Sequence, residues 1–149
     1  MFKTILIPVD LEEPAFAQPA IAVALRELDP NGGTLHLMTV MPGFASPLVA
    51  SFFDPATVKK AHQAVDKHLV DFAAQQLPAN VPHSLSVHQG HPAERIIKQA
   101  AAINADMIIM SAHHRSRLDS ALLGSNSARV VERAQCSVMI LRGDALKAT

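Results

Sequence analysis

Five short apolar runs recur along the chain and alternate with stretches in which apolar residues return every three or four positions. The runs lie at residues 3–9, 34–40, 83–89, 106–111 and 136–142. The run KTILIPV at 3–9 and the run DMIIMS at 106–111 are almost continuously apolar, a pattern typical of strands buried on both faces. The run HSLSVHQ at 83–89 alternates instead. Together these runs predict five strands.

Between the strands, apolar residues follow the period of amphipathic helices. Helices are expected at 13–28, 56–77, 90–105 and 125–134. Pro19 does not suit a helix interior, so the first helix either begins near Pro19 or bends there. Strict alternation of strands and helices predicts a parallel sheet with helices on both faces and right-handed crossovers. A chain of 149 residues with no internal repeat is expected to form a single domain, 1–149.

Composition narrows the range of partners. The formal net charge is +0, which gives no long-range attraction to nucleic acid or to a membrane surface. Trp and Tyr are absent and aromatic residues make up 4%, so a surface for stacking bases is not expected. The opening apolar run is about five residues long, far short of the ~20 that a membrane span needs. No secretory signal is evident, and a cytoplasmic location is expected.

Histidine and cysteine offer little sign of a metal site. His83, His88 and His91 are close in sequence, as are His62 and His68, but neither group has the spacing or the cysteine neighbours of a metal site. These histidines are expected at the surface. The single cysteine cannot form an intramolecular disulfide and is expected to be a small buried thiol.

Suggestive residues follow the first two strands. In open α/β sheets, ligands bind beyond the carboxyl ends of the strands, where the strand order reverses. Asp10 follows the first strand and could accept hydroxyl groups from a ribose, or it could be a turn or helix-cap residue. Val40 and Met41 end the second strand and could flank a flat base, or they could belong to the core.

The end of the fourth strand is more informative. The stretch at 110–131 runs from an apolar strand through a polar loop to a glycine that opens a helix. Gly124 would let a ligand approach the backbone, and the N–H groups at a helix start bind phosphate well. The side chains of Ser125, Asn126 and Ser127 could donate to the same anion. Alternatively, serine and asparagine here are only a helix cap.

The loop before this helix is rich in basic and imidazole groups. It contains His113, His114, Arg115 and Arg117. The arginine guanidinium matches the geometry of phosphate. The loop is therefore either a second wall of a phosphate site or a solvated polar segment.

Four stretches of the sequence match a known family. ILIPVD at 5–10, MIIMSAHHR at 107–115, LLGSNSARVV at 122–131 and CSVMILR at 136–142 give the chain a resemblance, over nearly its whole length, to the universal stress protein family. Nucleotide-binding members carry glycine, two residues, glycine, nine residues, glycine and then serine or threonine.

Only the end of that signature is intact. Gly124 and Ser125 match its last two residues, and Asn126 follows as in many members. Ser111 and His114 stand at the first two glycine positions. Serine is small, whereas histidine would be unfavourable if that position required a positive φ. His114 or Arg115 could supply a charged contact in place of bare backbone.

The resemblance implies an open Rossmann-like α/β fold of the adenine nucleotide alpha hydrolase type, with five parallel strands in the order 3-2-1-4-5. It implies ATP or another adenine nucleotide between strands one and four, with Mg²⁺ carried by the nucleotide. By position, Asp10 would hold the ribose, Val40 would touch adenine, and the turn at 111–115 with 124–127 would hold the phosphates. The expected nucleotide-binding residues are Pro8, Val9, Asp10, Val40, Met110, Ser111, His113, His114, Arg115, Gly124, Ser125, Asn126 and Ser127.

The resemblance also implies a homodimer that acts in stress response or signalling. The last strand would pair with its twin through Val138, Met139, Ile140 and Leu141. An exposed apolar edge strand would otherwise favour aggregation.

Two alternatives stay open. One is a dimeric interaction protein of the same family that binds no nucleotide, because degraded glycines are typical of such members. The other is a slow ATP hydrolase. Asp10, His113 and His114 could take part in hydrolysis, but no paired carboxylates accompany them, so any turnover is expected to be weak.

Overall fold

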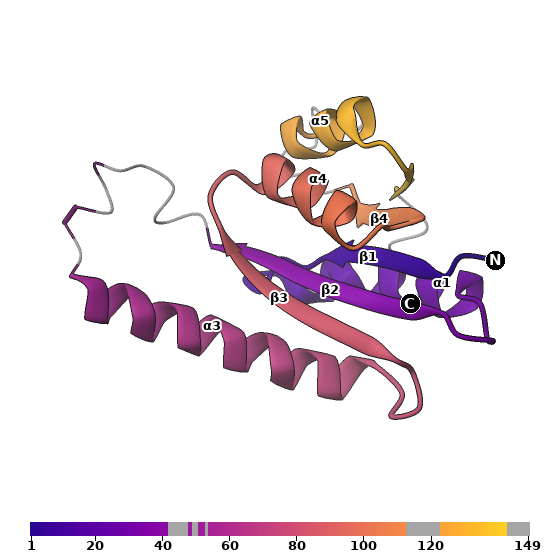
Figure 1. The fold of residues 1–149 in the computed structure, drawn as a ribbon, viewed down its shortest axis with the longest axis horizontal. Coiled ribbons are helices and arrows are strands. Elements are labelled where there is room, and N and C mark those ends of the chain that lie inside the picture. Colours follow the sequence, from indigo (N-terminus) through magenta and orange to yellow (C-terminus); the bar gives the residue numbers. More distant parts are fainter. Residues whose placement is uncertain (42–47, 49–50, 53, 113–122, 143–149) are drawn as a thin grey trace.

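A five-stranded parallel sheet forms the centre of the protein. The computed structural model describes residues 1–41, 48, 51–52, 54–112 and 123–142. The strand order is β3-β2-β1-β4-β5, which confirms the expected order (Figure 1). The strands are β1 (Thr4–Pro8), β2 (Thr34–Met41), β3 (His83–Gln89), β4 (Met107–Ser111) and β5 (Ser137–Leu141).

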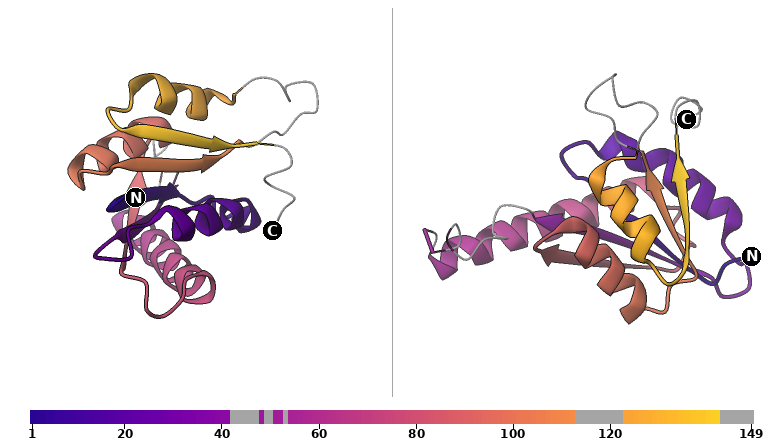
Figure 2. Two further views of the ribbon diagram at one scale, coloured as in Figure 1. Left: turned by 90° about the vertical axis from the view of Figure 1, so that its right-hand side faces the viewer. Right: turned by 90° about the horizontal axis from the view of Figure 1, so that it is seen from above.

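Helices cover both faces of the sheet, as the alternation of elements predicted. The helical elements are the short 3₁₀ helix η1 (Pro14–Phe16), α1 (Ala17–Glu27), α3 (Pro55–Gln76), α4 (Pro92–Ala102) and α5 (Ser125–Arg133). Figures 1 and 2 show α1 and α3 on one face and α4 and α5 on the other. In the described part of the chain, no helix has the length and apolar character required to cross a membrane.

Pro19 lies in the first turn of α1, which begins at Ala17 directly after η1. Proline is tolerated there because the N–H groups of the first turn have no partner within the helix. The first of the two predicted alternatives is therefore confirmed: the helix begins near Pro19.

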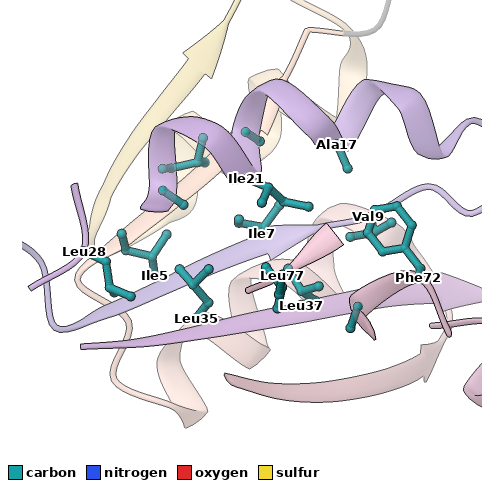
Figure 3. Packing of buried hydrophobic residues seen from close by; sticks show 14 of the residues in the cluster. Ile5, Ile7, Val9, Ala17, Ile21, Leu28, Leu35, Leu37, Phe72 and Leu77 are labelled. Atoms are coloured by element: carbon teal, nitrogen blue, oxygen red, sulfur yellow. The ribbon is translucent and has the colours of Figure 1, made fainter. Parts of the chain in front are cut away.

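The core has one layer on each face of the sheet. Ile5 and Ile7 of β1 point toward α1 and α3, and Leu6 points to the opposite face. Figure 3 shows the first layer, which also contains Ile21, Leu35, Leu37, Phe72 and Leu77. The second layer includes Met38, Ile96, Ile108 and Val130. Because β1 and β4 are covered on both sides, their sequences are almost continuously apolar.

Candidate functional site

The strand order reverses between β1 and β4. β1 pairs with β2 on one side and with β4 on the other, and Leu6 of β1 is aligned with Ile108 of β4. Pro8 and Met110 each lie two residues further along their strands, so the segments after them leave the same edge of the sheet. The chain passes from β1 to α1 on one face and from β4 to α5 on the other (Figure 2). This is the position at which open α/β sheets bind ligands.

Two hydrogen bonds fix the end of β1 to β2. The backbone N–H of Val9 donates to the carbonyl of Met38 over 2.7 Å, and the hydroxyl of Thr39 donates to the carbonyl of Val9 over 2.8 Å. The side chain of Val9 is buried in the core layer beneath α1. Val9 therefore positions Asp10 through its backbone. Thr39 was not among the predicted site residues, and its signal in the sequence was a hydroxyl two residues before the end of β2.

Asp10 is exposed and closes a turn. Its Oδ1 accepts from the backbone N–H of Glu12 over 3.0 Å, and its carbonyl accepts from the N–H of Glu13 over 3.1 Å. The turn role considered from the sequence is thus confirmed. That hydrogen bond engages Oδ1, and the exposed carboxylate keeps the capacity to accept from a hydroxyl group.

Three apolar residues surround the strand ends. Pro8 and Val40 are half-buried, whereas Met110 is buried. Val40 packs against the core layer beneath α4 and α5, and it is paired with His88 of β3. A half-buried valine at the end of a strand can present part of its surface to a planar group while the rest packs in the core.

Ser111, at the first position of the glycine signature, is tied to η1. Its hydroxyl donates to the backbone carbonyl of Phe16 over 2.5 Å, and the side chain is half-buried. The next residue, Ala112, donates its N–H to Leu141 of β5 over 2.8 Å. The serine side chain is therefore held toward the start of α1. It joins the segments that follow β1 and β4 across the reversal of strand order.

Loss of this contact should weaken folding. Replacing Ser111 by alanine removes the donor to Phe16, and we expect the free energy of unfolding to fall by about 1 kcal/mol. Urea denaturation would measure the change. The matched control is Ser137→Ala, which alters an exposed serine on β5. An equal effect of the two substitutions would show that the Ser111 contact does not stabilise the fold.

The start of α5 is exposed and has no side-chain cap. Gly124 is the N-cap, with φ −61° and ψ 159°, and no side chain provides a cap hydrogen bond there. The alternative in which Ser125 or Asn126 caps the helix is therefore wrong, because both lie inside it. Gly124, Ser125 and Asn126 are exposed, and Ser127 is buried. The N–H groups of the first turn, with the positive end of the helix dipole, are suited to an anion.

The predicted site residues divide into two groups. The first group lies where the strand order reverses. Asp10 follows β1, Ser111 ends the neighbouring strand β4, and α5 is the next helix along the chain after β4. His113, His114 and Arg115 lie outside the described residues. Their predicted contact with phosphate therefore stays a prediction.

Comparison with known proteins identifies the family of the chain. The model of the universal stress protein family matches residues 1–142. A protein of Thermus aquaticus, named as a universal stress protein in the QAH/OAS sulfhydrylase 3′ region, is 32% identical over 142 residues. The match covers 95% of this chain and 100% of that protein.

Solved structures share the fold. The hypothetical protein MJ0577 superposes with a TM-score of 0.76 at 22% identity, covering 96% of this chain and 97% of that chain. A universal stress protein in complex with cAMP gives 0.59 at 17% identity, with coverage of 95% and 97%. A universal stress protein family protein from Arabidopsis thaliana with AMP bound gives 0.59 at 14% identity, with coverage of 94% and 91%. At these identities the likeness establishes the common fold.

Proposed function

The chain belongs to the universal stress protein family, and from that premise we propose that it binds an adenine nucleotide where the strand order reverses between β1 and β4. The observation that carries the proposal is the exposed, uncapped start of α5 at Gly124, on the segment that follows β4. A nucleotide supplies the anion that such a helix start accommodates.

The phosphates would lie against the first turn of α5. The donors would be the N–H groups of that turn, including that of the buried Ser127, and the hydroxyl of the exposed Ser125, and Asn126 would add an amide. Backbone donors at a helix N-terminus favour negative charge without requiring a cationic side chain. Mg²⁺ accompanying ATP would be held mainly by the phosphates, as is usual for this ion.

The nucleoside would lie over the ends of β1 and β2. Asp10 is exposed and offers a carboxylate oxygen to ribose hydroxyls, and Val40 offers a half-buried apolar surface to the base. The family relatives solved with cAMP and with AMP support an adenine nucleotide as the class of ligand. ATP is the proposed member of that class.

Direct detection of nucleotide tests this function. Freshly purified protein would be denatured and its small molecules separated by HPLC and identified by mass spectrometry. Calorimetric titration with Mg-ATP would follow. Co-purified ATP, ADP or AMP, or saturable binding at micromolar concentrations, is expected. The proposal fails if no nucleotide is recovered and the titration releases no heat.

We also propose that the protein is a homodimer formed through β5. In the described residues, β5 pairs only with β4, so its other edge carries unpaired backbone groups. Val138, Met139 and Ile140 are half-buried on this edge strand. Pairing with a second copy would satisfy the backbone groups and cover the apolar side chains.

Proline at one position should separate such a dimer. The carbonyl of Leu141 faces β4, so by alternation the backbone N–H of Val138 faces the open edge. Val138→Pro removes that N–H at similar side-chain volume, and we expect a monomer by light scattering after size exclusion. Val138→Ala is the control that keeps the N–H and should stay dimeric. A Val138→Pro dimer would place the interface elsewhere.

A dimeric interaction protein without nucleotide is the second candidate. The observation that favours it is the side chain of Ser111, which occupies a motif glycine position and is engaged with Phe16. An intact dimer that neither contains nor binds adenine nucleotides would support this function over the first.

A further inference from the structure

A chain of hydrogen bonds joins two histidines on the face of the sheet that α4 covers. His36 of β2 is 5% exposed, and its Nδ1 lies 2.5 Å from the hydroxyl of Ser84 on β3. Its Nε2 lies 2.7 Å from the hydroxyl of Ser86, and that hydroxyl lies 2.7 Å from Nε2 of His88. His88 was predicted at the surface, but it is half-buried and belongs to this chain of hydrogen bonds.

Gln99 of α4 indicates which atoms donate and which accept in this chain of hydrogen bonds. Its amide nitrogen lies 3.2 Å from Nε2 of His36, and an amide nitrogen can only donate. Nε2 of His36 therefore accepts, so the proton of the neutral ring is on Nδ1, which donates to Ser84. Ser86 must then donate its single proton to His36, and His88 must donate from Nε2 to Ser86. With the Gln99 amide in this orientation, this arrangement of protons gives each bond a donor and an acceptor.

The surroundings oppose positive charge on either ring. Leu6, the partner of His36 on β1, is apolar and fully buried. Burial lowers the pKa of His36, and the neighbouring His88 lowers it further. Burial likewise lowers the pKa of His88, as do Arg95 on α4 and His62 on α3. The charged groups that act on the two rings are thus all basic.

We propose that the hydrogen-bond chain from His88 through Ser86 to His36 is a proton-sensitive link that holds the edge strand β3 to β2. Figure 1 shows β3 along the edge of the sheet, with α3 on one side and α4 on the other. In the described part of the chain, β2 is the sole strand that pairs with β3. Acidification should therefore loosen β3 more than the central strands.

Protonation of His88 and protonation of His36 have different consequences for the hydrogen bonds. His88 can take a proton on Nδ1 and still donate from Nε2 to Ser86, so the chain survives. A proton on Nε2 of His36 turns an acceptor into a donor. The Gln99 amide and the Ser86 hydroxyl must then reverse, and His88 must carry its proton on Nδ1, before the bonds can form again. The positive charge also lies at a buried position. Protonation of His36 is therefore the event that weakens the link.

The direction of the pH effect follows from the lowered pKa values. A histidine in the unfolded chain has a pKa of about 6.5, and both histidines lie below that in the folded protein. Below about pH 6.5 the unfolded state binds more protons, so stability is complete above that pH. Stability is lost as the pH falls toward the lowered folded pKa values.

NMR of the wild-type protein tests the link directly. We expect Nδ1–H on His36 and Nε2–H on His88 from ¹⁵N shifts at pH 7.5, and a His36 pKa below that of exposed histidines. The N–H of Leu35 donates to the carbonyl of Pro82, so by alternation the amides of Ser84 and Ser86 face β2. Protection of these two amides should fall between pH 7.5 and 5.0 more than that of Ile108 and Ile109 on β4. The extra loss is about tenfold for each unit by which the pKa is lowered.

A variant that lacks the His36 imidazole separates the effect of titrating His36 from the general effects of acid on stability. His36→Gln keeps a donor and an acceptor but cannot titrate, so the extra loss of β3 protection should fall to the part that His88 contributes. His83→Gln replaces an exposed histidine on the same strand and should retain the loss. A His36 ring with Nε2–H or an unlowered pKa would overturn the proposal, and so would equal losses in β3 and β4. Because the tautomers and pKa are measured on the wild type, the test holds even if His36→Gln does not fold.

Discussion

Replacement of Gly124 by valine is expected to reduce the affinity for Mg-ATP by about 100-fold. The phosphates must approach the N–H groups at the start of α5, and a branched side chain on the N-cap residue would keep them away. A hydrogen bond to a charged group contributes roughly 1.5–3 kcal/mol. Loss of two such bonds corresponds to at least about 100-fold, at about 1.4 kcal/mol for each factor of ten. Isothermal titration calorimetry would measure the change.

The fold should tolerate this substitution. Gly124 has φ −61° and ψ 159°, a conformation that any residue adopts, and it is exposed. The glycine is therefore not required by the backbone dihedral angles. It is a favourable N-cap residue and also allows a ligand to approach the backbone closely. Thermal unfolding of Gly124→Val should give a midpoint within a few degrees of wild type.

Two controls separate blocking of the site from a general effect on α5. Gly124→Ala adds one methyl group and should give an intermediate affinity. Ala128→Val makes a similar change at an exposed position one turn further along the helix and should bind as the wild type does. Unchanged affinity in Gly124→Val would remove the start of α5 from the binding site, whatever else binds the nucleotide.

The fold was predictable because burial leaves a periodic record in the sequence. Ile5, Leu6 and Ile7 alternate between the two core layers, so a strand covered on both faces reads as a continuous apolar run. The strand at 83–89 alternates because one of its faces carries Ser84, Ser86 and His88. The strand order, in contrast, came from the family resemblance. Periodicity identifies the elements but not their neighbours.

The details of the site were less predictable because they depend on distant partners. Ser111 is joined to Phe16 across 95 positions of sequence, and His36 is joined to Ser84 across 48. A serine in place of a motif glycine predicts only a change of size, not the direction of its hydroxyl. Asp10 was more accessible to sequence reasoning, because its partner Glu12 is two residues away.

The cap of α5 shows a different limit. Glycine, serine and asparagine are all good N-cap residues, so the sequence Gly-Ser-Asn left the first helical residue undecided. The structure assigns the cap to Gly124, which leaves Ser125 and Asn126 in the first turn. That shift of one residue turns a capped helix end into a candidate anion site. Propensity alone could not decide between the two.

Adjacent valines on α5 should differ sharply in their contribution to stability. Val130 is completely buried in the core layer beneath α4 and α5, whereas Val131 is 46% exposed. Val130→Ala removes two buried carbon atoms, at about 0.8 kcal/mol each, and leaves a cavity. We expect the free energy of unfolding to fall by about 2–3 kcal/mol, measured by urea denaturation without nucleotide.

Val131→Ala makes the same chemical change on the exposed face of the same helix. It should alter the free energy of unfolding by no more than about 0.5 kcal/mol, because alanine is also the better helix former. The pair matters for function because Val130 packs the helix whose first turn is the candidate phosphate site. Equal stability of the two variants would show that Val130 does not hold α5 against the core. The position of the helix start, on which the proposed phosphate site depends, would then lose its support.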